Sequence, residues 1–439
     1  MRNLQRHQMR PFTARPAMLI LGILALSCPP AAWSQPAGDS ADAAAAEQNN
    51  SPRARHRQAS QLFRAGNVIE ARRLWDEAAA QDPNLPPSDI AVAFAYLEQG
   101  NLASARVAID TAAGRVPDSP LLWIARAQLA AGERGLGTAR DALHKAHDMA
   151  PGLYITNLWL GQFYEERGAL SDATEYYKAA VAADSQRTEA LTGIARLQFR
   201  TLDMDGAFRT LQRVSEIDPT VSAESRMAAL YLNAGDLPGA LMWQEQAVAQ
   251  QPGNQDALVA LARLQLRLKQ FDSARATIER IPAWEDAPRL LLLHAQIDDD
   301  EGRSDEAAAL YRKIIQLDPE NVIALNNLAM ILLESDQSRD EAVDAAARAI
   351  ALAPGNPAVR ATHACALQAS GHKDAATALQ RAVHEVPADP WVRFFYGRLL
   401  SDRKQHAQAR TQLRACLLLD SEFPRKEEVD TLLETLPAG

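Results

Sequence analysis

The sequence predicts an all-α fold, a solenoid of about eleven helix-turn-helix repeats that ends in a C-terminal capping helix. Small residues recur along the chain at steps of 33 to 35 residues, once in each first helix and once in each second helix. Proline closes most of the repeats, and apolar residues between these marks are spaced as on one helix face. A hairpin of two short helices cannot bury both of its apolar faces alone, so each hairpin requires neighbours.

The small positions set the register of the repeats. In the first helices they are Ala59, Ala93, Ala127, Gly161, Ala195, Ala228, Ala262, Ala295, Ala329, Ala364 and Gly397. In the second helices they are Ala71, Ala105, Ala139, Ala173, Ala207, Ala240, Ala274, Ala307, Ala342, Ala376 and Ala409. The closing prolines are Pro83, Pro117, Pro151, Pro219, Pro252, Pro282, Pro319, Pro354 and Pro387, and Ser185 and Ser421 stand in their place elsewhere.

The fourth repeat shows the pattern most clearly. Gly161 and Ala173 are small on the faces that should be buried, so the two helices can approach closely. Gly168 is expected to end the first helix, because a glycine tolerates the left-handed conformation found there. Ser171 or Asp172 is expected to cap the second helix.

This pattern resembles the tetratricopeptide repeat (TPR) family, whose repeat carries W-x2-L-G-x2-Y, then A-x3-F, then a closing proline. The spacing matches in all the repeats, from about residue 52 to 423, and Trp123 fits the first aromatic, although several repeats have Leu there. The resemblance implies a right-handed superhelical solenoid whose first helices line a concave groove. It also implies protein partners, bound there as extended peptides or short helices.

The domain organisation follows from the repeats. Residues 35–51 are rich in small and polar residues and are expected to be a flexible linker. Repeats one to seven should occupy residues 52–286 and repeats eight to eleven residues 287–423. Two prolines six residues apart lie at this boundary, which indicates either an irregular joint between two sub-stacks or a variable loop. Residues 424–439 should form the capping helix and tail.

Residues 1–34 are expected to be a secretory signal peptide, because a basic start precedes a short apolar segment. The apolar run Ala17–Leu26 is too short to span a membrane. Small residues precede the position expected for cleavage, between Ser34 and Gln35. Lipidation at Cys28 is the alternative, and either form of export would place the chain in the periplasm of a Gram-negative cell.

Signals for catalysis are absent from the sequence, which has no H-E-x-x-H, P-loop or G-x-S-x-G motif. The repeats leave no room for a catalytic domain, so we expect neither enzymatic activity nor a cofactor. His144 and His147 lie three apart on a helix but have no evident third metal ligand. The net charge of −9 argues against nucleic acid as the partner.

The sequence also predicts the surroundings of two acidic runs and of two cysteines. The acids at the ends of first helices, Glu165-Glu166 and Asp298-Asp299-Asp300, are expected at a solvated edge or in partner contacts. Cys365 and Cys416 are expected to stay reduced, with Cys416 buried and Cys365 near the inner groove.

The candidate site is the concave groove, where a partner peptide or acidic segment would bind. By the phase of the repeats, the groove is expected to contain Arg196, Phe199, Arg200, Arg263, Leu266 and Arg267, with Gln162, Glu165 and Glu166 from the fourth repeat. Arginines with apolar neighbours suit an acidic or carboxylate-bearing partner. The alternative is that these arginines pair with acids of adjacent repeats.

The expected function is a non-catalytic periplasmic scaffold or adaptor for protein–protein interactions in a cell-envelope assembly. The run N-N-L-A-M-I-L-L-E resembles TPR proteins that accompany bacterial exopolysaccharide synthesis and export. Alternatives are a biogenesis factor for cytochromes, pili or outer-membrane proteins, or a carbohydrate-binding solenoid that stacks sugars on Phe94, Phe199, Trp391 and Phe394. Contact with a membrane is expected only through a partner or a lipid anchor.

Overall fold

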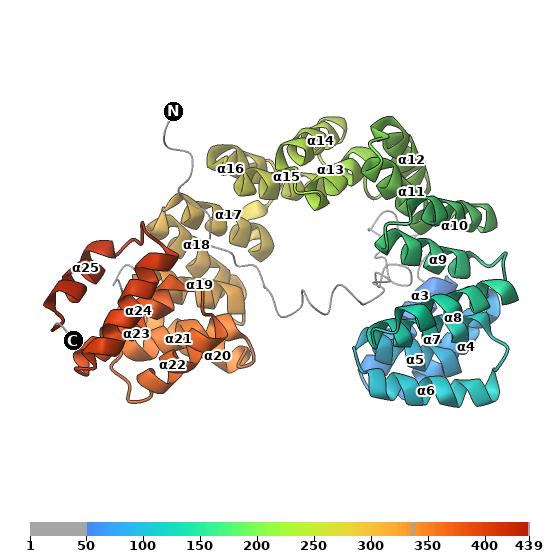
Figure 1. Ribbon diagram of the computed structural model, residues 1–439. Coiled ribbons are helices and arrows are strands. Elements are labelled where there is room, and N and C mark those ends of the chain that lie inside the picture. Colours follow the sequence, from blue (N-terminus) through green and yellow to red (C-terminus); the bar gives the residue numbers. More distant parts are fainter. Residues whose placement is uncertain (1–50, 335–337, 438–439) are drawn as a thin grey trace. The chain divides into compact units, whose positions relative to one another are not determined.

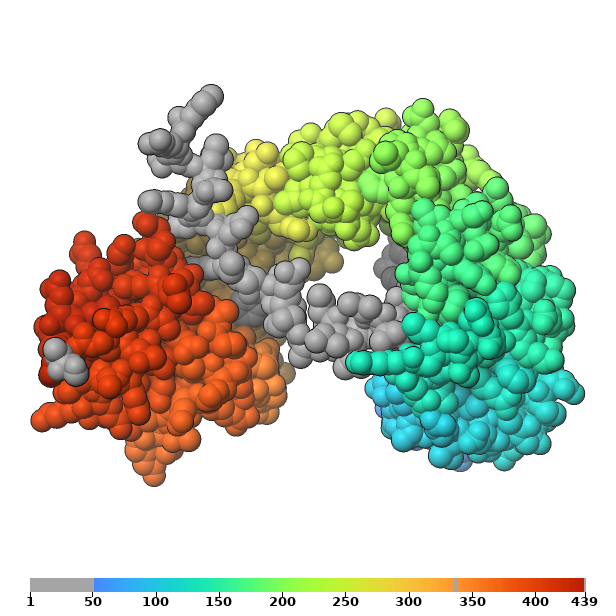
Figure 2. All heavy atoms as spheres, viewed as in Figure 1, coloured from blue at the N-terminus to red at the C-terminus, as the bar shows by residue number. Residues whose placement is uncertain are grey.

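The computed structural model describes residues 51–334 and 338–437, and every regular element in these ranges is a helix (Figure 1). Internal contacts divide the chain into two compact units, one up to Ala247 and the other from Val248. In the space-filling view the neighbouring repeats of each unit form a continuous surface (Figure 2). The all-α repeat fold is confirmed, with eleven helical hairpins and a C-terminal helix.

The N-terminal unit holds the first six hairpins, which are stacked in chain order. They are α3 (Pro52–Arg64) with α4 (Val68–Gln81), α5 (Ser88–Glu98) with α6 (Leu102–Arg115), α7 (Pro120–Gly132) with α8 (Leu136–Met149), α9 (Tyr154–Glu166) with α10 (Leu170–Ala183), α11 (Thr188–Arg200) with α12 (Met204–Ile217), and α13 (Ala223–Asn233) with α14 (Leu237–Gln250), whose last turn crosses the boundary.

The C-terminal unit holds the other five hairpins and the cap. They are α15 (Gln255–Arg267) with α16 (Phe271–Glu279), α17 (Pro288–Glu301) with α18 (Ser304–Leu317), α19 (Val322–Glu334) with α20 (Arg339–Leu352), α21 (Pro357–Ala369) with α22 (Ala375–Glu385), and α23 (Pro390–Asp402) with α24 (His406–Leu419), followed by α25 (Lys426–Thr435).

The register set by the small residues is confirmed in all first helices and in all second helices but one. Each predicted small residue of a first helix is buried, as are ten of the eleven in the second helices. The exception is the tenth repeat, where Ala375 is fully buried and Ala376 is only partly so. The prediction of Ala376 was therefore one residue late, because α22 begins at Ala375.

The turn inside each hairpin has one residue with a positive φ, in the left-handed region. This residue is a glycine in some repeats and another residue type in the others. Six repeats use a glycine there, such as Gly168 at φ 73°. Five repeats use another residue, such as Leu202 at φ 64°. Side chains are strained in this region, so the tight hairpin geometry is maintained in those repeats at some cost in stability.

One capping prediction is wrong. The N-cap position of α10 is Ala169, and no side chain caps this helix. Ser171 and Asp172 lie inside the first turn instead, where their side chains cannot reach the first free amides in cap geometry. Burial of Ala173 and Tyr177 against α9, rather than a cap, defines this helix.

The segment between the seventh and eighth repeats is irregular, as the prolines indicated. Helix α16 has only 9 residues, and a single 3-10 turn, η1 (Trp284–Asp286), follows Ala283 at φ 55°. The two compact units divide earlier, after Ala247, so their boundary does not coincide with the expected change of sub-stack at residues 286–287.

The cap and the cysteines complete the C-terminal unit. Val429 of α25 is fully buried, and Arg410 Nη2 donates to the carbonyl oxygen of Leu436 at 2.9 Å. Both cysteines are free and fully buried. Cys365, expected near the inner groove, has no exposed surface there, because its side chain packs inside the apolar core of α21 and its neighbours. Burial raises the pKa of both thiols.

Candidate partner-binding surface

The fourth and fifth repeats place Glu165 and Arg196 in a direct ion pair. Arg196 Nε donates to Glu165 Oε1 at 2.9 Å, and its Nη2 donates to Oε2 at 2.7 Å. The Tyr177 hydroxyl donates to the same Oε2 at 2.6 Å. The Glu165 side chain is only 12% exposed, so it lies in an internal network and not at a solvated edge as expected.

Two opposing effects act on the carboxyl of Glu165. Burial alone would raise its pKa, but the hydrogen bonds from Arg196 and Tyr177 and the positive charge of Arg196 outweigh burial and lower it. Glu165 is therefore held ionised, and its charge is used within the chain. In this place the structure favours pairing between adjacent repeats, the alternative that the sequence left open.

Tyr177 occupies the space that two glycines leave between three helices. A β-carbon on Gly161 of α9 would lie 2.5 Å from the ring of Tyr177, and one on Gly193 of α11 would lie 2.6 Å from it. The ring is therefore sandwiched between the fourth and fifth repeats. This close approach explains why glycine replaces alanine at the small position of the fourth repeat.

The other groove residues predicted on α11, Arg200 and Phe199, also form contacts within the chain. Arg200 is exposed but donates through Nη1 to the backbone oxygen of Glu165 at 3.2 Å. Phe199 packs edge-on against Tyr231 of α13, with ring centroids 4.9 Å apart. These residues join neighbouring repeats.

Gln162 and Glu166 differ from their neighbours on α9. Gln162 Oε1 is buried and has no hydrogen-bond partner among the described residues. Glu166 lies 3.9 Å from Arg167 and is 37% exposed. Partial burial, together with the negative charge of Glu165, raises the pKa of Glu166 to about 7 although Arg167 acts against the shift.

The predicted residues on α15 belong to the C-terminal unit. Arg263 and Arg267 are exposed there, and neither forms an ion pair or hydrogen bond with another described residue. Leu266 between them is partly buried. These two arginines are thus the members of the predicted cluster whose charge remains available to a partner.

In the N-terminal unit, side chains also form contacts between distant repeats, which the sequence pattern did not reveal. These contacts lie at the starts of the first helices, the edge called the inner edge below. Asn84, in the turn between α4 and α5, accepts a hydrogen bond from the backbone amide of Ile155 in the fourth repeat at 3.2 Å. Arg53 of the first repeat lies 3.8 Å from Glu189 of the fifth. Glu189 also accepts from the Tyr154 hydroxyl at 3.0 Å.

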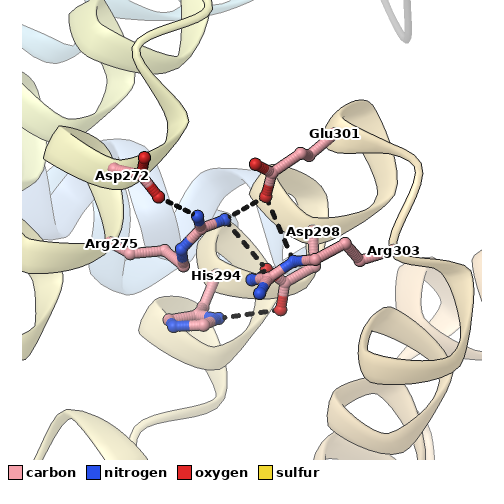
Figure 3. Close-up of polar contacts among 6 residues, drawn as sticks. All are labelled: Asp272, Arg275, His294, Asp298, Glu301 and Arg303. Carbon is pink, nitrogen blue, oxygen red and sulfur yellow. Dashed lines mark hydrogen bonds and ion pairs between the residues drawn. The ribbon is translucent and has the colours of Figure 1, made fainter.

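A second charged network, centred on Asp298, joins the seventh and eighth repeats (Figure 3). Its carboxylate pairs with Arg303 of the following turn, lies 3.4 Å from Arg275 of α16, and lies 3.2 Å from His294. The Asp298 side chain is 2% exposed, so the expectation of a solvated edge at this acid is wrong.

This network also fixes the irregular segment before α17. Trp284 of η1 stacks on His294 with centroids 4.9 Å apart and an angle of 9° between the rings. The hydrogen bond from Arg275 to Glu301 raises the pKa of Arg275 and keeps its cation in place. A periodic pattern gives no signal for such a cluster, because its members lie outside the repeat consensus.

Two other predicted sets take structural roles. His144 Nε2 lies 2.8 Å from the Tyr164 hydroxyl, and no group of three potential metal ligands occurs among the described residues. Of the aromatics proposed to stack sugars, Phe94, Trp391 and Phe394 are buried, which leaves those rings inaccessible to a ligand.

Comparison with protein families decides the class of the chain. Models of the tetratricopeptide repeat match residues 62–129, 231–297 and 292–357. The chain is a tetratricopeptide repeat protein. Proteins of this fold generally mediate protein–protein interactions, and the first helices and turns described above are its usual elements.

Curated relatives of this TPR protein come from Komagataeibacter xylinus. It is 27% identical to cellulose synthase 2 operon protein C over 282 residues, which is 62% of this chain and 20% of that protein. It is 24% identical to cellulose synthase 1 operon protein C over 245 residues, 55% of this chain and 17% of that protein. The chain thus spans about a fifth of the length of these relatives.

Solved structures show only a distant likeness. The Cut9–Hcn1 hetero-tetramer of the APC/C gives a TM-score of 0.43 at 11% identity, covering 88% of this chain and 96% of that one. Yeast Tom70 gives 0.36 at 15% identity, covering 88% and 95%. At these scores the likeness supports no statement about function.

The predicted lipidation site, Cys28, and the predicted cleavage site, between Ser34 and Gln35, lie outside the described residues. Within residues 51–334 and 338–437, no helix is both long and apolar enough to cross a membrane.

Proposed function

We propose that this TPR protein is a non-catalytic periplasmic scaffold that holds protein partners in a cell-envelope assembly for exopolysaccharide synthesis or export. The observation that carries the proposal is the similarity to two cellulose synthase operon C proteins over more than half of this chain. The repeat fold supports a binding role, and the basic start and apolar run of residues 1–34 support export.

The surface proposed for the partner is the exposed side of α15. Arg263 and Arg267 lie four residues apart, so both guanidinium groups lie on the same side of the helix. Their charges are not neutralised by another described residue, whereas Arg196 is paired with Glu165. An acidic segment of a protein would satisfy both arginines, because guanidinium groups bind carboxylates in a bidentate manner.

A genetic test addresses this proposal in the native cell. Deletion of the gene should abolish or reduce the exported polysaccharide, and the wild-type copy should restore it. A copy with Arg263→Glu and Arg267→Glu should restore less. Fractionation should recover the mature chain from the periplasm, with Gln35 as its first residue if the cleavage prediction holds.

The matched control is a copy with Arg209→Glu and Arg213→Glu. These arginines are also exposed and four residues apart, but they lie on the second helix α12. This control should restore the polysaccharide fully. Unchanged polysaccharide in the deletion strain would contradict the proposed function, and equal defects in both variants would remove α15 as the partner surface.

A further inference from the structure

A groove with a volume of about 490 Å³ opens between the tenth and eleventh repeats. Residues of α22, α23 and α24 line it, so its walls come from both second helices and from the first helix of the last repeat. The volume is in the range of sites for small ligands, about 300 to 1,000 Å³. It is a concave site, whereas protein interfaces are generally broader surfaces.

Uncharged hydrogen-bonding groups dominate the polar part of the lining. Three glutamines, Gln380, Gln408 and Gln412, face it together with Thr411. Amide and hydroxyl groups can both donate and accept, as the hydroxyls of a sugar do. Gln380 and Gln408 are exposed and form no hydrogen bond with other described residues, so their amides are available to a ligand.

The one permanent charge in the lining is fixed by the chain itself. Arg393 Nη1 donates to Gln412 Oε1 at 2.7 Å, and its Nη2 donates to the backbone oxygen of Pro387 at 3.1 Å. No aspartate, glutamate or lysine is among the residues of the groove. A cationic ligand therefore finds no counter-charge, and an anionic ligand finds a guanidinium that is already partly occupied.

Apolar groups complete the lining. Val383 and the ring of Tyr396 are partly buried, and Leu400 is 2% exposed. They offer a C–H and aromatic surface beside the amides. A pyranose has the same combination, with hydroxyls around its edge and apolar C–H faces.

We propose that this groove binds a neutral oligosaccharide segment of two to three sugar rings, about what its volume holds. The ligand class follows from the lining, and the identification of the ligand with an exported polysaccharide rests on the proposed function. The site is distinct from the buried aromatic rings on which the sequence placed sugar stacking. In it, Gln380 and Gln408 bind hydroxyls while Tyr396 and Val383 contact the ring faces.

The test is a titration of the purified full chain, followed by calorimetry and saturation-transfer NMR. The probes are a neutral β-1,4-glucose hexamer, an anionic galacturonate oligomer and a cationic chitosan oligomer. The neutral hexamer should bind, and the two charged oligomers should bind more weakly. The double variant Gln380→Ala and Gln408→Ala should bind the hexamer about tenfold more weakly, since two hydrogen bonds are lost.

Two further variants test the location. Thr411→Trp places a large ring in the groove from an exposed position and should abolish binding, while its circular dichroism and melting temperature stay as in the parent. Gln246→Ala changes an exposed glutamine of α14 and should bind like the parent. Absence of binding, preference for a charged oligomer, or undiminished binding by Thr411→Trp would each overturn the inference. None of these results would affect the deletion test, so the two proposals fail separately.

Discussion

The two compact units share one repeat but differ at the inner edge formed by the starts of their first helices. Ile155 of the fourth repeat and Ile323 of the ninth have the same residue type and the same repeat position. Ile155 is 1% exposed, whereas Ile323 is 45% exposed. The repeat position alone therefore does not determine burial.

The turn between α4 and α5 accounts for part of this difference. Pro86 and Pro87 delay the start of α5 until Ser88, so residues 82–87 remain outside the helices. Asn84 in this turn then reaches the amide of Ile155 in the fourth repeat. In the C-terminal unit, side-chain contacts such as those of Arg289 with Asp256, Arg312 with Glu341 and Arg360 with Glu385 join residues of the same or neighbouring repeats.

This difference between the two units bears on where a partner can bind. The inner edge of the N-terminal unit uses its polar groups for contacts within the chain, and Glu165, Arg196 and Arg200 do the same further along the helices. In the C-terminal unit, Arg263 and Arg267 keep their charges available. We therefore expect the N-terminal unit to be chiefly structural at these positions and the C-terminal unit to carry the binding surface.

The largest expected effect comes from the pair Ile155→Asp and Ile323→Asp. A carboxylate in place of the buried Ile155 should lower the free energy of unfolding by about 3 kcal/mol or more, because a buried charge has no partner. The same change at Ile323 should cost less than about 0.5 kcal/mol. Urea denaturation measures the loss, and hydrogen exchange locates it in one unit. Equal losses for the two variants would mean that the inner edges do not differ.

The sequence predicted the repeats well and the contacts between distant repeats poorly. The small residues and A-x3-F spacing placed Ala173 and Tyr177 correctly, because both follow from local helix packing. Nothing in that pattern reveals that Asn84 meets Ile155, since the pair is 71 residues apart. Asp298 was misjudged for the same reason, because its burial depends on Arg275 and Arg303 from flanking elements.

The second prediction concerns the close packing of Tyr177. Gly161→Ala should lower the free energy of unfolding by about 1–3 kcal/mol, because the added β-carbon would overlap the Tyr177 ring. Ala295 occupies the same repeat position beside Tyr311 in the C-terminal unit, so an alanine is accommodated there. Thermal denaturation of Gly161→Ala and of the parent measures the loss of stability. A more stable Gly161→Ala would show that helix propensity outweighs packing and that the ring has room to shift.

The third prediction tests the contact between the first and fourth repeats. Asn84→Ala removes the acceptor for the Ile155 amide and should cost about 1 kcal/mol, the usual net value of a hydrogen bond. Exchange of the Ile155 amide with solvent should become faster. The control Asn233→Ala changes an exposed asparagine at the end of α13 and should leave stability within about 0.5 kcal/mol. Unchanged exchange at Ile155 in the Asn84 variant would show that the contact does not protect this edge.

The smallest expected effect is a pH dependence at Glu166. Its pKa is raised to about 7 in the folded chain, so the folded state binds a proton more tightly than the unfolded state does. The stability that this proton contributes is present below the ordinary value of 4.5 and is lost as pH rises through 7. Glu166→Gln carries no such proton, so its melting temperature relative to the parent should rise over the same range. The gain should be small, because the side chain is 37% exposed and solvent screens its charge. A constant difference between variant and parent across this range would show that Glu166 is solvated like an ordinary surface acid, and that the inner surface of the fourth repeat is more open than its contacts indicate.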